Sequence, residues 1–521
     1  MVKNSTARLE ELCSEGLSRR RLILASNRGP IEYQFSPEGQ LQAQRGSGGV
    51  VTALTGLSKY IDVCWIASAM GEGDREAARR VREEGARLAP LGEGLHLHFV
   101  VNPRNTYHKF YGVFCNPLLW FLQHYMWNSP RTPNIDHAVH DAWENGYIPV
   151  NQAFARAVVD EAKRSESPPI VMLNDYHLYL ASANIRQQLP DVLIQHFIHI
   201  PWPSSHYWQL LPASMRQAIH ESLCTTDIVG LQTQRDVLSF MQCCHTFIEG
   251  AEINYKQQTV TINDHVVMVK AYPTSVDVLG LRKIVASVRC QEYEEKLSRL
   301  CGEQTIIRVD RCDPSKNIIR GFRAFDALLE RYPQFRGKVK FITFLVPTRT
   351  HIKTYQRYAE ESLEIIGAIN NKYRTENWHP IDLFYENNYV QAIAGMRLYD
   401  VMLVNAVIDG MNLVAKEGPT VNSRDGVLIL SEGAGACEQL GQSALVVTPT
   451  DLEGTTQALY TALTMPLAER RRRAVELKRM IEEEDMTNWL QHLLGDMVTL
   501  IQERSGITTG GSVPHQLRRS D

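Results

Sequence analysis

Asp409-Gly410-Met411-Asn412-Leu413-Val414-Ala415-Lys416-Glu417 is the stretch that decides the fold of this chain, and it follows the apolar run at residues 401–404. An apolar run, then Asp-Gly, then helix-forming residues predicts a buried strand, a tight turn and a helix start. The first amides of a helix lack intrahelical partners and carry the positive end of the helix dipole. The turn is therefore a candidate site for a diphosphate, bound at Met411, Asn412 and Leu413.

Two carboxylates and a glycine extend this candidate site. Gly410 allows the backbone to approach a ligand closely. Asp409 and Glu417 stand a little over two helical turns apart, so one carboxylate can hold sugar hydroxyls and the other a ribose. Taken alone, the stretch also fits an ordinary capped helix with a solvated Lys-Glu pair.

Length and charge bound the remaining possibilities. The chain has 521 residues, which is more than one hydrophobic core usually supports, so we expect two or three domains. Its formal net charge of -3 carries no bulk signal for nucleic acid or an anionic membrane, so we expect neither partner. Any site for an anionic ligand must therefore come from a local group of basic residues.

Cysteine usage and hydropathy indicate the cellular setting. The ten cysteines include the adjacent pair Cys243 and Cys244, but they form no Cys-x-x-Cys pattern and suggest no disulfide framework. No run of about 18 apolar residues occurs, and the N-terminal residues have no apolar signal-peptide core. We therefore expect a soluble, cytoplasmic protein with reduced cysteines.

Apolar runs alternate with helical segments in two successive series, which is typical of parallel sheets flanked by helices. Strands are expected at residues 22–25, 170–173, 192–200, 228–231 and 266–271, and then at 305–309, 339–346, 381–385, 400–404, 427–430 and 444–447. The predicted fold class is α/β, with two Rossmann-like, doubly wound domains facing a cleft.

The domain boundaries follow from the same pattern. Residues 272–277 are the expected crossover between the two halves. We predict an extension at 1–20, an N-terminal domain at 21–276, a C-terminal domain at 277–484, a helix at 485–503 that packs back on the N-terminal domain, and a flexible tail at 504–521.

Polar and basic side chains follow several of the expected strands, where ligands of such sheets bind. Arg311 and Lys316 stand five residues apart around a Pro-containing turn, so they can converge on one diphosphate. Arg349 and Arg28 end strands in the second and first halves and can each contact a phosphate. A surface ion pair worth about 0–1 kcal/mol is the simpler alternative for such residues.

Three weaker patterns remain open at this point. The Gly-rich loop at residues 46–49 precedes a helical run and can offer further free amides. His137 and His140 have the spacing of two metal ligands, but no third ligand is evident, so we expect no metal. Paired carboxylates for a glycosidase need a spacing of about 5 Å, which a sequence does not show.

Taken together, these motifs resemble the trehalose-6-phosphate synthase family, which are retaining, nucleotide-sugar-dependent glycosyltransferases with the GT-B fold. The resemblance runs from about residue 22 to about residue 503. Its most specific pieces are residues 409–417, Asn174-Asp175-Tyr176-His177, His199-Ile200-Pro201, Gly230-Leu231-Gln232-Thr233 and residues 311–316.

The resemblance implies a role for each site residue. Asp409, His199, Arg311 and Lys316 would be catalytic. The donor would be bound by Gly48, Gly49, Arg311, Lys316, Asp409, Gly410, Met411, Asn412, Leu413, Val414, Ala415, Lys416 and Glu417, and the acceptor by Arg28, Tyr111, Trp120, Asp175 and Arg349. Within these sets the resemblance places Glu417 on the ribose, Asp409 on the transferred glucose, and Trp120 and His199 around the reacting sugars.

Several departures from the family pattern concern donor and acceptor choice. Typical members have Arg where this chain has Ile408, and Asp-Tyr-Ser-Lys-Gly where it has Asp313-Pro314-Ser315-Lys316-Asn317. The turn at residues 431–440 also differs from the family's Asn-Glu pair by one residue identity. The Pro and Asn after Arg311, and the segment at residues 199–204, are similar to the branch that includes validoxylamine synthase.

From the resemblance we expect a glucosyltransferase that forms α,α-trehalose 6-phosphate from a nucleoside-diphosphate glucose and glucose 6-phosphate. It implies attack on the face that the diphosphate leaves, without a covalent intermediate, a prosthetic group or a metal. Alternatives are a glucosylglycerol-phosphate synthase, a validoxylamine-type enzyme, and a catalytically silent sugar-phosphate sensor. The donor base (UDP, GDP or ADP) and a homo-oligomeric state stay open.

Overall fold

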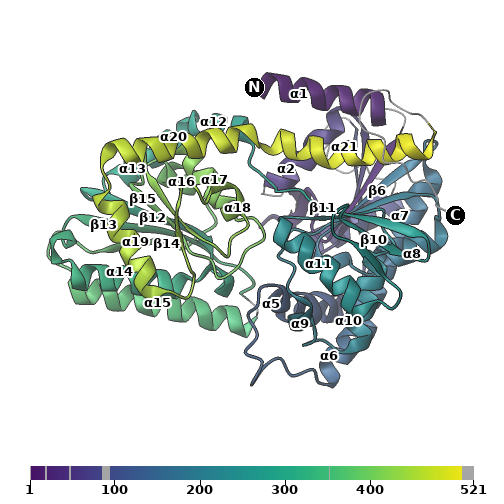
Figure 1. Ribbon diagram of the computed structural model, residues 1–521, viewed down its shortest axis with the longest axis horizontal. Helices are drawn as coiled ribbons and strands as arrows, with labels where there is room; N and C mark the ends of the chain where they lie inside the picture. Colours follow the sequence, from purple (N-terminus) through teal and green to yellow (C-terminus); the bar gives the residue numbers. More distant parts are fainter. Residues whose placement is uncertain (1, 18–19, 46–48, 85–93, 351, 507–521) are drawn as a thin grey trace.

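The computed structural model describes residues 2–17, 20–45, 49–84, 94–350 and 352–506. Two α/β domains lie side by side, one built on a nine-stranded sheet and the other on a six-stranded sheet (Figure 1). The predicted fold class is therefore confirmed.

The N-terminal sheet has the order β5-β4-β1-β6-β7-β8-β11-β10-β9. Its strands are β1 (Arg21–Ser26), β4 (Asp62–Ser68), β5 (Leu95–Val100), β6 (Pro169–Asn174), β7 (Leu193–Phe197), β8 (Ile228–Leu231), β9 (Glu252–Asn254), β10 (Thr259–Ile262) and β11 (His265–Ala271). Strands β5 to β11 in this order pair in parallel, whereas β10 pairs antiparallel with β11 and β9. A separate antiparallel hairpin joins β2 (Ile31–Phe35) and β3 (Leu41–Arg45).

The C-terminal sheet is parallel throughout, in the order β14-β13-β12-β15-β16-β17. Its strands are β12 (Gln304–Arg311), β13 (Val339–Val346), β14 (Ile381–Phe384), β15 (Val401–Val404), β16 (Val427–Ser431) and β17 (Leu445–Val447). All six expected strands of this half are confirmed within one residue at each end, except that β12 extends two residues further at its carboxyl end.

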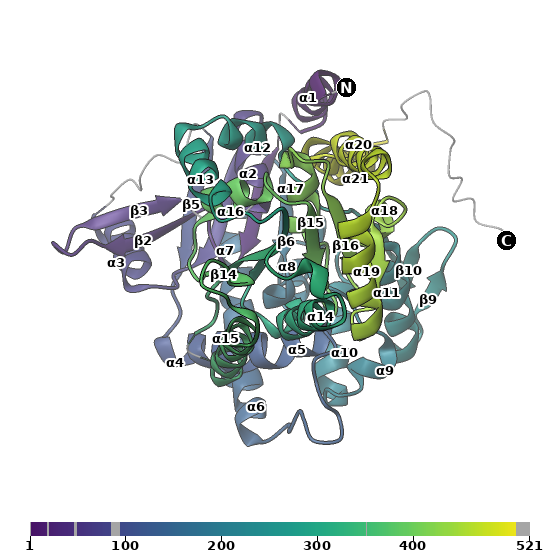
Figure 2. The same ribbon diagram turned by 90° about the vertical axis from the view of Figure 1, so that its left-hand side faces the viewer.

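Helices cover both faces of each sheet, and Figure 2 shows the second domain end-on. In the N-terminal domain they are α1 (Val2–Glu11), η1 (Leu12–Leu17), α2 (Gly49–Gly56), η2 (Leu57–Lys59), α3 (Glu72–Glu84), α4 (Arg104–Tyr107), η3 (His108–Leu119), α5 (Trp120–Gln123), α6 (His137–Ala142), η4 (Trp143–Tyr147), α7 (Ile148–Arg164), η5 (Tyr176–Leu178), α8 (Ala181–Gln188), α9 (Ser205–Trp208), α10 (Ala213–Leu223) and α11 (Gln234–Phe247). The rest are α12 (Val278–Val285), α13 (Val288–Ser298), η6 (Pro314–Lys316), α14 (Ile318–Arg331), η7 (Pro333–Phe335), α15 (Lys353–Tyr373), α16 (Tyr389–Met396), α17 (Val414–Val421), α18 (Ala436–Leu440), α19 (Leu452–Thr464), α20 (Leu467–Glu483) and α21 (Met486–Arg504).

Burial on both faces explains the uninterrupted apolar runs of the central strands. In β1, Ile23 belongs to the hydrophobic cluster on one face of the sheet and Leu24 to the cluster on the other. Ile307 and Ile306 of β12 divide in the same way between the two faces of the second sheet. Each domain therefore has a core on both sides of its sheet.

Several strands of the N-terminal sheet are not predicted by the sequence pattern. The pattern indicates no strand at β4, β5, β9 or β10, and it predicts that β7 reaches residue 200, whereas β7 ends at Phe197. Short apolar runs such as β4 have no periodicity that separates a buried strand from a helix. After β7 the amide of Ile198 still donates to the carbonyl of Gly230 in β8 at 2.8 Å, whereas the amide of His199 donates to the Asp175 side chain.

The chain crosses between the domains twice, at neighbouring points. Residues 272–277 lead from β11 to α12, and the amide of Met486 donates a hydrogen bond to the carbonyl of Val276 where α20 passes into α21. Helix α20 lies over the C-terminal domain and α21 over the N-terminal domain (Figure 1). Trp489 of α21 packs edge-on against Phe197 at 5.6 Å.

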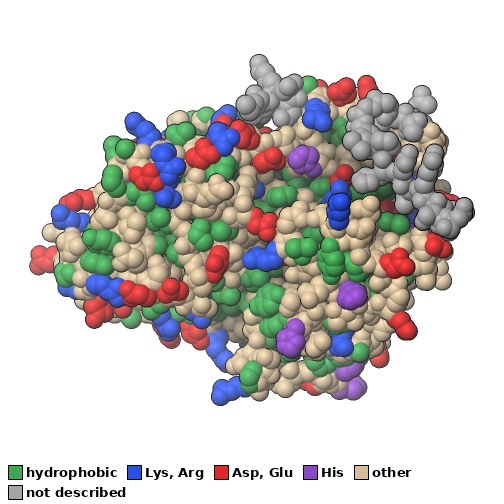
Figure 3. Space-filling view, in the orientation of Figure 1, with side chains coloured by type: hydrophobic (Ala, Val, Ile, Leu, Met, Phe, Trp, Pro, Cys, Tyr) green, Lys and Arg blue, Asp and Glu red, His purple; other side chains and the backbone are tan. Residues whose placement is uncertain are grey.

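The surface in the view of Figure 3 carries acidic and basic side chains in mixed groups over the C-terminal domain. This mixture agrees with the small net charge of the chain. Among the described residues, no helix is long and apolar enough to cross a membrane.

Candidate active site

A cavity of about 740 Å³ lies between the two domains, where the carboxyl ends of strands from both sheets meet. Its lining comes from the segments after β1, β6 and β7 on one side and after β12 and β13 on the other. It brings together seven of the site residues expected from the sequence: Arg28, Tyr111, Trp120, Asp175, His199, Arg311 and Arg349.

Trp120 forms an aromatic platform for two arginines of the opposite domain. Its side chain is buried, and the guanidinium carbons of Arg349 and Arg311 lie 4.1 Å and 5.3 Å from its ring centroid. His124 stacks on the same indole at 4.0 Å. Because an aromatic face attracts a cation, the indole holds both guanidinium groups beside the cavity.

Arg349 is fixed by several further contacts. Its Nη1 donates to the Asp313 carboxylate at 3.1 Å and to the Tyr355 hydroxyl at 2.7 Å, and its Nη2 donates to the Tyr176 hydroxyl at 3.4 Å. Arg311, in contrast, is exposed at the end of β12, and its guanidinium donates no hydrogen bond to any described residue. Arg311 therefore has all its donors open to a ligand.

Asp175 lies in a strained turn directly after β6. Its backbone has φ of 70°, which is uncommon for a residue other than glycine, and its carboxylate accepts a hydrogen bond from the amide of His199 at 3.3 Å. Burial raises the pKa of Asp175 to about 7. This carboxylate can therefore change protonation state near neutral pH.

His199 stays neutral in the same environment. Burial lowers the pKa of His199 to about 3, and its Nε2 lies 3.3 Å from the side-chain oxygen of Asn174. A neutral imidazole can donate or accept a hydrogen bond but contributes no charge.

Lys316 and Asp409 are paired beside this cavity. The Lys316 ammonium donates a hydrogen bond to the Asp409 carboxylate, which also accepts one from the side-chain amide of Asn412 at 3.0 Å. Although burial opposes ionisation, the Lys316 ammonium holds the pKa of Asp409 below its ordinary value. The sequence predicted a diphosphate as the partner of Lys316, whereas in the structure its ammonium donates to the carboxylate of Asp409.

Gly410 packs against the backbone of the facing domain with no room for a side chain. A Cβ atom at this position would lie 2.0 Å from the carbonyl oxygen of His199, and one at Gly435 would lie 1.8 Å from the carbonyl oxygen of Gly410. The sequence predicted a close approach to a ligand at Gly410. The approach that the structure shows is to the backbone of the facing domain, so glycine is required for packing.

The helix after this turn starts later than expected. Helix α17 begins at Val414, so Met411, Asn412 and Leu413 form the turn before it, and Asn412 has φ of 66°. None of the described residues accepts a hydrogen bond from the amides of these three residues. They remain open donors at the positive end of a short helix.

The side chains of residues 415–417, at the end of the motif, do not all point toward the cleft. The Lys416 side chain is fully buried and its Nζ donates to the carbonyl of Thr274 in the domain crossover at 2.9 Å, and burial lowers the pKa of Lys416 to about 7. Ala415 is also fully buried. Glu417 accepts a hydrogen bond from the Tyr389 hydroxyl at 2.7 Å. Lys416 thus joins the first turn of α17 to the domain crossover and does not point into the cleft.

The remaining expected residues lie at the margin of the cavity, outside the described residues or away from the site. Arg28 lines the cavity with its side chain 63% exposed and pairs with Glu32 at 3.2 Å. Gly48 lies outside the described residues, and Gly49 is the first residue of α2. His137 and His140 are exposed on α6, and no group of three potential metal ligands occurs among the described residues.

Asn317 explains one departure from the family pattern. It ends the 3₁₀ turn η6 with φ of 57°, a conformation that glycine adopts freely and asparagine tolerates. Its side chain donates to the carbonyls of Asn405 at 2.9 Å and Pro449 at 2.7 Å. The asparagine therefore keeps the backbone shape and adds two hydrogen bonds.

Three residues at the site had no role in the sequence analysis. Asp313 is fully buried and caps η6 while it holds Arg349, and Tyr355 binds the same arginine from α15. The position of Asp313 within the Arg311 to Lys316 motif was the available signal. Tyr355 and the stacked His124 carry no local signal, because only the tertiary fold brings them to the cleft.

Two Rossmann-like domains that face a cleft lined by strand-end arginines define the chain as a GT-B glycosyltransferase by architecture. The model of the family described as Glycosyltransferase family 20 matches residues 20–499. The chain belongs to this family, the trehalose-6-phosphate synthase family.

Similar proteins support this assignment. The chain is 30% identical to the UDP-forming α,α-trehalose-phosphate synthase of Schizosaccharomyces pombe, over 94% of this chain and 92% of that one. It is also 30% identical to trehalose-6-phosphate synthase of Citrobacter koseri, over 92% and 95% of the two chains. These matches do not show that the chain belongs to the validoxylamine synthase branch.

Solved structures agree over nearly the whole chain. An E. coli structure with bound UDP-2-fluoro glucose has a TM-score of 0.77 and 28% identity, covering 92% of this chain and 99% of that chain. A UDP-forming α,α-trehalose-phosphate synthase from Burkholderia xenovorans in complex with glucose-6-phosphate has a TM-score of 0.75 and 26% identity, with the same coverage.

Proposed function

We propose that this chain transfers glucose from a nucleoside-diphosphate glucose to glucose 6-phosphate and forms α,α-trehalose 6-phosphate with retention of configuration. One observation carries the proposal: a single interdomain cavity gathers the five expected acceptor residues with His199 and Arg311, and the Lys316–Asp409 pair lies beside it. The family membership and the ligands named for its relatives support the same substrates.

The acceptor would bind among the cations and aromatic rings of the cavity. Arg28 and Arg349 supply positive charge for a phosphate, and Tyr111 offers an aromatic edge, stacked on His177 at 6.0 Å. Asp175 lies within the same cavity, where its carboxylate can accept a hydrogen bond from a sugar hydroxyl. These contacts would position the attacking hydroxyl.

The donor would lie on the C-terminal domain. The open amides of Met411, Asn412 and Leu413 and the free guanidinium of Arg311 would bind the diphosphate, and Lys316 would add its charge as the leaving group departs. Asp409 would bind hydroxyls of the transferred glucose, and Glu417 the ribose. Because several relatives are UDP-forming, UDP-glucose is the first donor to test.

Retention without a covalent intermediate fits this arrangement. The acceptor hydroxyl attacks the face from which the diphosphate leaves, the glycosidic carbon–oxygen bond to the diphosphate breaks, and the departing diphosphate accepts the hydroxyl proton. The side chains then act by positioning and charge stabilisation. Neutral His199 near the sugars contributes a hydrogen bond and not a proton transfer.

Other acceptors and a sensor role remain rival proposals. A glucosylglycerol-phosphate synthase or a validoxylamine-type enzyme would share the donor side and differ at acceptor contacts. A silent sugar-phosphate sensor has no need for the open Arg311 and the paired Lys316 and Asp409. The intact set of charges therefore favours an enzyme.

The deciding experiment measures nucleoside-diphosphate release from UDP-glucose and GDP-glucose, with and without glucose 6-phosphate, and identifies the product by mass and anomeric linkage. We expect release that depends on glucose 6-phosphate and gives an α,α-linked disaccharide phosphate. No release with either donor would contradict the proposal and direct attention to other phosphorylated acceptors or to a sensor.

A further inference from the structure

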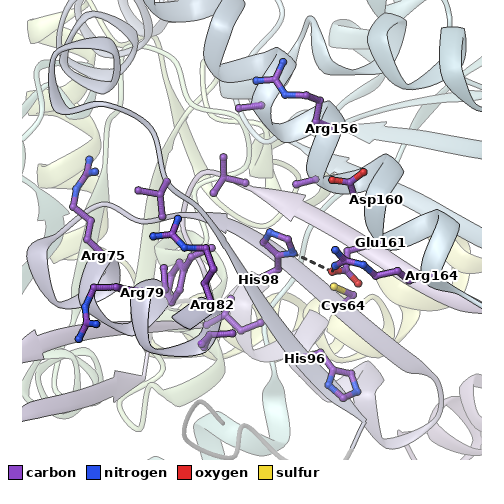
Figure 4. Close-up of a pocket in the computed structure, with 18 of the residues that line it drawn as sticks. Cys64, Arg75, Arg79, Arg82, His96, His98, Arg156, Asp160, Glu161 and Arg164 are labelled. Carbon is purple, nitrogen blue, oxygen red and sulfur yellow. Dashed lines mark hydrogen bonds and ion pairs between the residues drawn. The ribbon is translucent and has the colours of Figure 1, made fainter. Parts of the chain in front are cut away.

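A second large cavity lies on the outside of the N-terminal domain. It has a volume of about 780 Å³ and is bounded by α3, α7 and the edge strand β5, and we call it the outer basin (Figure 4). A volume of this size suits a small-molecule ligand, for which sites commonly measure about 300–1,000 Å³.

The outer basin and the interdomain cleft are separate. Arg21, the first residue of β1, lines the outer basin, whereas Ser26, its last residue, lines the cleft. At a rise of about 3.3 Å per residue, these two ends of the strand lie about 17 Å apart. The two cavities share no lining residue, and none of the residues proposed for catalysis lines the basin.

The lining of the outer basin is strongly basic. Six arginines and two histidines face it against two carboxylates, Asp160 and Glu161, although the chain as a whole has a net charge of -3. Figure 4 shows Arg75, Arg79 and Arg82 on one side and Arg156 and Arg164 on the other. The two groups come from α3 and α7.

Part of this charge is already neutralised within the protein. Arg79 pairs with Glu76, Glu83 and Glu84, and Arg164 with Glu161. The His98 ring holds the pKa of Glu161 at about 2, so this carboxylate stays ionised and occupied by its neighbours.

Arg156 is the exception. It is exposed on α7, and none of the described residues forms a hydrogen bond or ion pair with it. The Nη1 of Arg75 donates one hydrogen bond to the carbonyl of Asn102 at 2.8 Å. On each of two opposite walls the basin thus keeps guanidinium donors that form no hydrogen bond within the described part of the chain.

The floor between these walls is apolar. Leu97, Phe99 and Val100 of β5 and Ala153 and Ala157 of α7 line it. An apolar floor under a basic rim fits a ligand with one hydrophobic or planar part and one phosphate group.

We propose that the outer basin binds a phosphorylated small molecule, with a phosphate on Arg156 and its less polar part on the β5 floor, which faces Arg75 on the opposite wall. Two sources share this chemistry. An inorganic polyphosphate uses the charges alone, whereas a nucleotide uses the floor as well.

Calorimetric titration of the full chain with pyrophosphate and with ATP tests the proposal. We expect both to bind, ATP more tightly because its base covers the floor. Arg156→Ala should weaken binding at least five-fold, and Arg156→Lys should recover part of it. None of the described residues pairs with the Arg156 side chain, so its loss removes no contact that the structure describes. Arg323→Ala is the matched control, because Arg323 is also exposed and unpaired among the described residues, on α14.

Hydrogen exchange by mass spectrometry locates the bound molecule without any activity assay. Protection by ATP is expected in residues 72–84, 95–100 and 148–164. Protection confined to residues 311–316 and 409–417, with binding unchanged by Arg156→Ala and lost in Lys316→Ala, would place the anion in the cleft and overturn the proposal. Absence of binding at millimolar concentration would also overturn it, and tighter binding of pyrophosphate than of ATP would remove the role of the floor. None of these outcomes depends on the proposed transferase reaction.

Discussion

The ammonium of Lys316 donates a hydrogen bond to the carboxylate of Asp409, which stands 93 residues later in the chain. The two side chains are only 10% and 14% exposed, so the pair is largely shielded from solvent. The pair joins the turn after β12 to the turn after β15. A ligand that binds either side chain therefore acts on both.

Replacing Lys316 by Ala should lower kcat/KM by about 10²–10³-fold, because it removes a positive charge beside the departing diphosphate. Steady-state kinetics with UDP-glucose and glucose 6-phosphate measure this loss. Lys340→Ala is the matched control. Lys340 forms an equally buried pair with Asp382 at 2.7 Å, but it lies at the amino end of β13, away from the cleft. That variant should be less stable yet turn over normally when folded. Near-normal turnover in Lys316→Ala would contradict its proposed role.

Gly410→Ala should impair activity strongly, because the added methyl would lie 2.0 Å from the carbonyl oxygen of His199 and force the two domains apart. We expect at least a ten-fold loss of kcat/KM, measured beside Gly367→Ala. A Cβ at Gly367, an exposed position in α15, meets no atom within 4 Å, so that change should stabilise the helix by about 0.5–1 kcal/mol. Equal activities of the two variants would show that the domain contact is dispensable.

Asp175 should make the stability of the protein depend on pH. Its folded-state pKa of about 7 lies above the ordinary value of 3.8, so its contribution to stability is present at low pH and is lost as the pH rises from about 4 to 7. Asp175→Asn removes this loss. The difference in unfolding free energy between variant and wild type should shift in favour of the variant by about 2–3 kcal/mol from pH 5 to pH 8.5.

Urea unfolding at the two pH values measures this shift. His177 and His199 do not interfere, because burial holds the pKa of each at about 3 and both stay neutral over this range. A constant difference between Asp175→Asn and wild type at both pH values would mean that Asp175 is ionised throughout.

Asn317 permits a separation of backbone strain from hydrogen bonding. Asn317→Gly and Asn317→Ala both lose the hydrogen bonds to Asn405 and Pro449, but only alanine is strained at φ of 57°. The glycine variant should therefore be more stable than the alanine variant by about 1 kcal/mol in urea unfolding. If alanine proved equal or better, the left-handed conformation would not be required there.

The strands of the second domain were predictable because each is a short apolar run bounded by turn residues, as at β13 and β16. The grouping of Arg28, Asp175, His199 and Arg349 was predictable for a related reason: each follows a strand, and the carboxyl ends of parallel strands lie at one edge of a sheet. β4 and β5 were missed, because their residues carry no periodicity that distinguishes a buried strand.

The sequence by itself determined the fold class, the family resemblance and the chemical types at the strand ends, since these depend on local pattern. Only the tertiary structure decided which partner each charged group has. Lys316 pairs with Asp409, Arg349 lies on Trp120, Lys416 holds the crossover at Thr274, and Gly410 contacts His199. Each of these contacts joins residues far apart in the chain, and several join the two domains. Their geometry follows from how the sheets and domains pack, which no local stretch of residues specifies.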